Sequence, residues 1–101
     1  RNAEWRARFG LDCYTCWGSA VDAEGLGIQV DHAAMNETSL MLALRPDLVE
    51  MAALPARPEE WPLAVEGKDP RRHASADLGR RILALQRERM AGILRAALAN
   101  L

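Results

Sequence analysis

The segment that most constrains the fold lies at residues 31–49, where a short polar stretch runs directly into an apolar helix. Its large apolar residues recur at three- and four-residue steps, the spacing of one face of an α-helix. These residues are Leu40, Met41, Leu44 and Leu48. Asn36 is the expected N-cap, and Pro46 should end the helix near Arg45, because the residue before a proline disfavours the helical conformation. We therefore expect a buried helix with a polar entrance.

A titratable pair, Asp31 and His32, stands just ahead of this helix, and Glu37 falls in its first turn. A helix N-terminus can bring a base, a carboxylate and free backbone N–H groups together. Two interpretations of His32 stay open: a histidine that simply hydrogen-bonds, or a catalytic acid–base group or metal ligand. His32 and Glu37 can face one pocket if the backbone turns between them, since on an unbroken helix they would diverge by about 140°.

Composition excludes several classes of protein. The chain has 101 residues, of which 50% are hydrophobic and 27% charged, so it predicts at most one globular domain rather than a disordered segment. The formal net charge of -1 gives no electrostatic reason to bind nucleic acid or an anionic membrane surface. No apolar run approaches the ~18 residues of a membrane span.

The N-terminal third predicts a helix end at residues 1–10 and a strand at residues 11–17, which are rich in aromatic and strand-compatible residues. Cys13 and Cys16 form a Cys-x-x-Cys pair. On a strand, residues three apart point to opposite faces, and the chain has no second cysteine pair to complete a zinc site. We therefore expect two reduced thiols, as is usual in a cytoplasmic protein.

The C-terminal half predicts an irregular segment at residues 50–74 and a helix at residues 75–101. Prolines punctuate the first, which includes a turn at Gly67 and a surface histidine, His73. Ser75 is a natural N-cap for the helix. The apolar stripe of this helix is continuous enough to cover a sheet face, and a coiled coil is the alternative. The stripe runs through Leu78, Ile82, Leu85, Arg89, Ile93, Leu94, Ala97 and Leu101, with Met90 beside it, and Arg89 would interrupt the seam of a coiled coil.

The order of elements predicts an α/β fold, in which helices cover a sheet that these residues alone do not supply. A single strand at residues 11–17 cannot make a sheet. The sequence also begins with Arg1 rather than methionine. We therefore expect a missing segment or a companion N-terminal polypeptide to complete the domain.

Three motifs carry a resemblance to a known family. They read Asp-His-Ala at 31–33, Glu-Thr-Ser at 37–39 and Pro-Asp-Leu-Val at 46–49, followed by Gly-Lys-Asp-Pro at 67–70 and Ala-Ser at 74–75. In this order and spacing the chain resembles the creatininase (creatinine amidohydrolase) family, from the end of its N-terminal half to its C-terminus. It departs from the family pattern at Ala34, where the family usually has glycine.

The resemblance implies the C-terminal part of a three-layer α/β/α fold, incomplete on its own. It also implies a metal-dependent hydrolase of C–N bonds, often in cyclic amides, that uses one or two zinc or manganese ions and often forms hexamers. In that case His32 matches the proton-transfer histidine and Asp31 its neighbouring acid. Trp17 matches a tryptophan that lines the substrate pocket, and Glu37 a plausible metal ligand.

The family's principal metal ligands lie in its N-terminal half and have no counterpart in this sequence. The expected site would therefore be completed by another chain or segment, and these residues alone should bind a metal poorly. The alternative function is a non-catalytic scaffold or protein-interaction module. In that alternative, the proline-rich segment and the last helix bind a partner.

Overall fold

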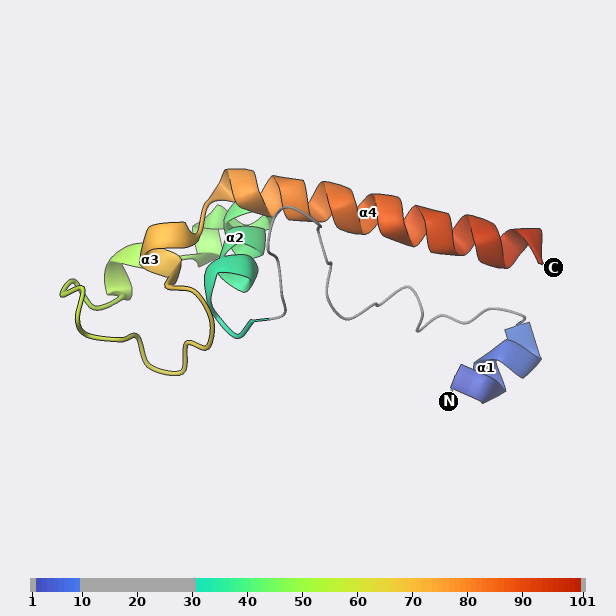
Figure 1. The fold of residues 1–101 in the computed structure, drawn as a ribbon, viewed down its shortest axis with the longest axis horizontal. Coiled ribbons are helices and arrows are strands. Elements are labelled where there is room, and N and C mark those ends of the chain that lie inside the picture. Colours follow the sequence, from blue (N-terminus) through green and yellow to red (C-terminus); the bar gives the residue numbers. More distant parts are fainter. Residues whose placement is uncertain (1, 10–30, 101) are drawn as a thin grey trace.

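The computed structural model describes residues 2–9 and 31–100, and these residues are largely helical. Figure 1 shows α2 and α3 gathered near the beginning of α4, whose C-terminal half projects away from them. The elements in chain order are α1 (Asn2–Phe9), α2 (Met35–Leu44), the 3-10 turns η1 (Pro46–Leu48) and η2 (Met51–Ala53), α3 (Pro70–His73) and α4 (Ala76–Ala99). No helix within the described ranges combines the length and apolar character that a membrane crossing requires.

The prediction of an α/β fold, and with it the three-layer creatininase-like arrangement, is wrong for this structure. Within residues 2–9 and 31–100 helix packs on helix, and the β pairing there is an isolated antiparallel bridge between His32 and Glu66. Of the stripe of α4 that was expected to cover a sheet, the first part, Leu78, Ile82 and Leu85, packs against α2 instead. The strand expected at residues 11–17, with Cys13 and Cys16, lies outside the described residues.

The contact between α2 and α4 is a close approach of two backbones. Ile82 is 1% exposed and packs with Leu40, Leu78 and Leu85. One turn earlier, Gly79 lies directly against Ser39, so that a Cβ atom on Gly79 would be 1.9 Å from the Ser39 carbonyl oxygen. The helices can approach this closely because both residues are small and no large side chain separates them.

The packed face of α2 differs from the predicted one. Met35, Asn36 and Ser39 are buried, whereas Leu44 and Leu48 are 58% and 62% exposed. The expected burial of the whole leucine stripe is therefore wrong: Leu40 packs on Ile82, whereas the close backbone contact with α4 is made at Ser39. The helix ends at Leu44, immediately before Arg45, which confirms the predicted stop ahead of the proline.

Ser75 joins the two helices through hydrogen bonds made on both sides. Its Oγ accepts the N–H of Leu78 at 3.0 Å, which confirms the predicted N-cap of α4. Its own N–H donates to Ser39 Oγ at 3.0 Å. Ser39 is completely buried, and this bond satisfies its hydroxyl. The start of α4 is thus tied to the middle of α2.

The irregular segment predicted at residues 50–74 is organised around one guanidinium. Arg71 forms an ion pair with Asp69, with 2.8 Å between Nη2 and Oδ2, and both side chains are largely buried. The Arg71 hydrogen bond lowers the pKa of the Asp69 carboxyl group below its ordinary value. Arg71 Nη1 also donates to three carbonyl oxygens, those of Pro55 at 2.8 Å, Arg57 at 3.1 Å and Glu60 at 3.0 Å.

The helix contact predicts opposite effects for two glycine substitutions in α4. Gly79→Ala should destabilise the fold by about 1–3 kcal/mol or more, because its methyl group would meet immovable backbone. Gly92→Ala adds the same methyl group in open space and should stabilise the helix by roughly 0.5–1 kcal/mol. Thermal unfolding followed by circular dichroism measures both, and similar changes at the two sites would contradict this packing.

The Arg71 clamp predicts how the loop depends on pH. Because the folded pKa of Asp69 is lowered, its ion pair stabilises the fold above the ordinary carboxyl pKa of about 3.9 and is lost as the pH falls through the folded value. Asp69→Asn should therefore reduce stability at neutral pH and flatten its decline below that range. Acid titration of the fold at constant ionic strength measures this.

Arg71→Lys supplies the matched test, because lysine keeps the charge but cannot present the planar fork to Asp69 and three carbonyl groups. We expect faster cleavage by a glutamate-specific protease at Glu59 and Glu60, which lie in the clamped loop. Arg72→Lys, at an exposed neighbour, should leave the cleavage rate unchanged. Equal protection of the loop in wild type and Arg71→Lys would show that the guanidinium does not hold it.

Candidate functional site

The N-terminus of α2 is capped by Asp31. The backbone N–H groups of Asn36 and Glu37 donate to its two carboxylate oxygens at 2.6 and 3.1 Å. Ala34 occupies the N-cap position and Asn36 lies buried inside the helix, so the prediction of an Asn36 cap is wrong. A carboxylate is the better partner here, because the free N–H groups and the dipole of a helix N-terminus both favour negative charge.

The backbone between His32 and Glu37 turns sharply, and a shared pocket for their two side chains stays a prediction. Ala33 has a φ of +50°, in the left-handed region. The Ala33 N–H donates to Glu37 Oε2 at 2.6 Å, which brings this carboxylate beside the residue that follows His32. Ala34, where the resembled family has glycine, has a φ of -100°, a conformation open to any residue.

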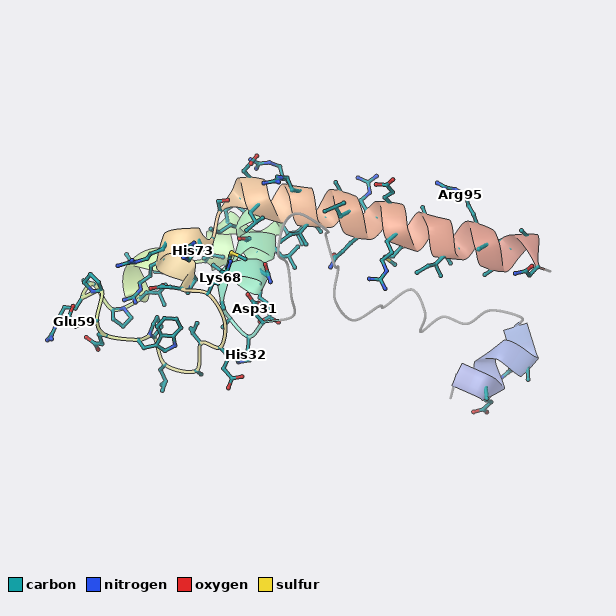
Figure 2. All side chains as sticks on the ribbon, in the orientation of Figure 1. Asp31, His32, Glu59, Lys68, His73 and Arg95 are labelled. Carbon is teal, nitrogen blue, oxygen red and sulfur yellow. The ribbon has the colours of Figure 1, made fainter. Side chains whose placement is uncertain are left out.

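Hydrogen bonds hold the backbone of His32, and its side chain is exposed. Its N–H donates to the Glu66 carbonyl oxygen and its carbonyl oxygen accepts the Glu66 N–H, both at 2.9 Å. Successive side chains on extended backbone point to opposite sides, so Asp31 is directed to α2 and His32 away from it. Figure 2 shows His32 beyond Asp31, on the side of the loop away from α4. The structure therefore does not pair these neighbours with each other.

Gly67 lets the second segment approach the loop that carries His32. Its φ is +139°, and a Cβ atom there would be 2.8 Å from the Cβ atoms of both Asp31 and Ala34. Next to it, the Lys68 carbonyl oxygen accepts the N–H of Met35 at 3.1 Å. The sequence marks a turn at Gly67 but not the segment on which it packs, which is why Glu66 was missed as a neighbour of His32.

The described side chains do not by themselves fit the divalent metal that the resemblance implies. Both oxygens of Asp31 accept backbone N–H groups, and one oxygen of Glu37 does the same. Among residues 2–9 and 31–100 no three or more His, Cys, Asp and Glu side chains are grouped so that they could hold a metal ion. Glu37 as a ligand stays a prediction, as does the pocket role of Trp17, which lies outside the described residues. His73 is exposed on α3, as expected.

In comparisons with known proteins, no family model matches the chain, and no match is found among curated proteins or solved structures. The likeness to the creatininase family therefore rests on the motifs in the sequence. The site has to be judged on its own geometry, which consists of a helix cap, a left-handed turn and an exposed histidine held by its backbone.

The cap predicts a graded loss of stability at Asp31. Asp31→Ala should cost about 0.5–2 kcal/mol, because two N–H groups of α2 lose their partner. Asp31→Asn should cost less, since its amide oxygen can still accept one of them. Asp47→Ala is the control, because its ion pair with Arg45 is exposed and contributes little. Urea unfolding measures all three, and an Asp31→Ala loss no larger than the control would refute the capping role.

Proposed function

We propose that this chain is one part of a hydrolase that cleaves the C–N bond of a cyclic amide or a similar small amide. In this proposal the chain supplies His32 as the proton-transfer group and forms one wall of the pocket. The motif resemblance supports the reaction class. The observation that carries the role of His32 is that its backbone is fixed on both sides while its side chain stays accessible.

The fixation has two sources. Asp31, directly before His32, is anchored on the N–H groups of α2. His32 itself exchanges both backbone hydrogen bonds with Glu66. A proton-transfer group must be positioned within hydrogen-bond distance of the atom it protonates, so a rigid backbone below a free imidazole suits this task.

The chemistry requires a group that changes protonation near neutral pH. When an amide C–N bond breaks, the leaving nitrogen needs a proton, and an imidazole can accept one from the attacking water and pass it on. Asp31 serves this reaction as a positioning residue, because its carboxylate is bound to α2 and not to His32. Glu37, held at Ala33, lines the same turn.

Further parts of the proposal come from the resemblance alone. Trp17 would contribute to the pocket, and the zinc or manganese ligands would come mainly from a companion N-terminal polypeptide or a missing segment. Assembly into a hexamer and a cytoplasmic location belong to the same expectation. The proposed proton transfer by His32 does not require that this chain supply the metal ligands.

A second candidate function is a helical interaction module, and α4 carries the observation that favours it. Met90, Leu94 and Leu98 recur at four-residue steps in the half of the helix that projects beyond α2, and they are 39%, 41% and 59% exposed. Such a stripe is typical of a helix that packs against another surface. This function is compatible with the hydrolase, since a split enzyme requires an interface.

His32→Ala tests the proposed function in the assembly that the full chain forms in its source cells, isolated through a tag. We expect hydrolysis of creatinine or a related cyclic amide in the presence of Zn²⁺ or Mn²⁺. The substitution should lower kcat by roughly a hundredfold or more, which is the usual contribution of a positioned proton-transfer group. Bound metal, measured by atomic emission, should stay constant, whereas Glu37→Gln should lower it if Glu37 is a ligand.

His73→Ala is the matched control, because the chain has two histidines and this one lies exposed on α3. It should retain wild-type turnover. Loss of bound metal in His32→Ala would make this residue a ligand and contradict the proton-transfer role. Absence of amide hydrolysis by the wild-type assembly across a panel of cyclic amides would refute the reaction class.

A further inference from the structure

Two exposed surfaces of the described structure combine large apolar side chains with charges of opposite sign. The first, the acidic loop, consists of residues 59–66. Its three acidic residues, Glu59, Glu60 and Glu66, are all exposed, and its sequence contains no lysine or arginine. Trp61 is 51% exposed and Leu63 is 96% exposed. The loop therefore presents two large apolar side chains among carboxylates, which is unusual for a surface that faces only water.

The acidic loop is held in shape by its own hydrogen bonds and by packing. Trp61 Nε1 donates to the Val65 carbonyl oxygen at 2.8 Å, which closes the turn that carries Leu63. Pro62 and Val65 are buried at its base. Arg71 Nη1 binds the Glu60 carbonyl oxygen at 3.0 Å. A surface that is already ordered loses little conformational entropy on binding, so this loop is suited to contact a partner.

The second surface, the basic stripe, lies on the half of α4 that projects beyond α2. It consists of Met90, Leu94 and Leu98, which are 39%, 41% and 59% exposed, together with the exposed Arg87, Arg89 and Arg95. At 3.6 residues per turn, Arg87 falls on the face of the apolar residues, and Arg89 and Arg95 lie on either side of it. The sequence of this half of α4 has one acidic residue, Glu88.

We propose that the acidic loop of one copy of this chain docks on the basic stripe of a second copy. Figure 2 shows Glu59 and Arg95 near opposite ends of the fold, so the two surfaces do not pair within one molecule. Each copy carries both surfaces. Two copies related by a two-fold axis can therefore exchange two identical contacts and form a closed dimer.

Charge complementarity selects this arrangement over the other ways in which two copies could meet. Two basic stripes facing each other would bring three arginines of one copy against three of the other, and two acidic loops would bring their glutamates together. Like charges juxtaposed across an interface are strongly unfavourable, whereas opposite charges fix the partner and the register. Burial of Leu63 against the apolar residues of the stripe supplies the hydrophobic part of the contact.

This inference deepens the interaction function considered for α4, because it names the partner as a second copy of the chain. It rests on that candidate function and not on the hydrolase. The hexamer implied by the family resemblance plays no part in it, since the contact is derived from the two surfaces alone.

Sedimentation velocity of the full chain over a range of concentrations tests the dimer through charge reversal. One variant carries Glu59→Lys and Glu60→Lys in the acidic loop, and a second carries Arg87→Glu and Arg95→Glu in the basic stripe. Each alone should raise the dimer Kd by roughly tenfold or more, because both contacts then join like charges. An equimolar mixture of the two should form a heterodimer near wild-type affinity, because both contacts again join opposite charges.

A pair of leucine substitutions tests the apolar part of the contact. Leu98→Ser, in the basic stripe, should weaken the dimer by roughly tenfold, since it removes a buried side chain from the interface. Leu48→Ser is the matched control, because Leu48 is 62% exposed and lies outside both surfaces. It should leave the Kd unchanged. Circular dichroism at equal concentration shows whether each variant keeps the helix content of the wild type.

Several results would overturn the inference. They are a wild-type chain that stays monomeric from micromolar to millimolar concentration, an unchanged Kd in the loop variant, and a mixture of the two charge variants that does not associate. Equal effects of Leu98→Ser and Leu48→Ser would also contradict it.

The same measurements separate the dimer from the other proposals. A monomeric chain whose isolated assembly hydrolyses cyclic amides would refute the dimer and leave the hydrolase intact. A dimer rescued by mixing the charge variants, in an assembly without amide hydrolysis, would refute the hydrolase and support the docking. A monomeric chain that loses a different bound polypeptide on Leu98→Ser would refute the second copy as the partner and leave α4 as an interaction surface.

Discussion

The close approach of α2 and α4 at Ser39 and Gly79 is the constraint on which the described fold depends. No side chain separates the two backbones there, so the position of α2 is set by the absence of a Cβ atom on α4. The Ser39 hydroxyl then accepts the N–H of Ser75, and Ser75 caps the helix that carries Gly79. Small residues set the distance between the two helices, and Leu40 packs beside them on Ile82.

The candidate site follows from this arrangement, because the N-terminus of α2 is its foundation. Its free N–H groups bind Asp31, and this anchors the backbone on one side of His32. The segment at Gly67 packs against the same loop and anchors the other side. The position of His32 therefore depends on the packing of α2 against α4. A substitution that shifts α2 also shifts the site.

Local chemistry made the end of α2 and the start of α4 predictable, whereas the start of α2 and the fold class were not predicted correctly. Ser75 caps α4 and Pro46 follows the end of α2 as expected, because capping and proline geometry act within a few residues. The fold class was wrong because an apolar helix stripe requires a covered surface but does not say whether that surface is a sheet or another helix. Asn36 is a residue type that often caps helices. Here the Asp31 carboxylate, which lies outside the helix and is a stronger acceptor, binds the free N–H groups instead.

In the site as well, features that depend on neighbouring residues were predicted, and contacts between segments far apart in the sequence were not. Sequence alone selected Asp31, His32 and Glu37, and the last of these accepts the N–H of Ala33, the residue that follows His32. It also suggested that adjacent acid and histidine work as a pair, but extended backbone sends adjacent side chains to opposite sides. The backbone of His32 is held instead by Glu66, the opposite member of the bridge, through a contact that no local pattern encodes.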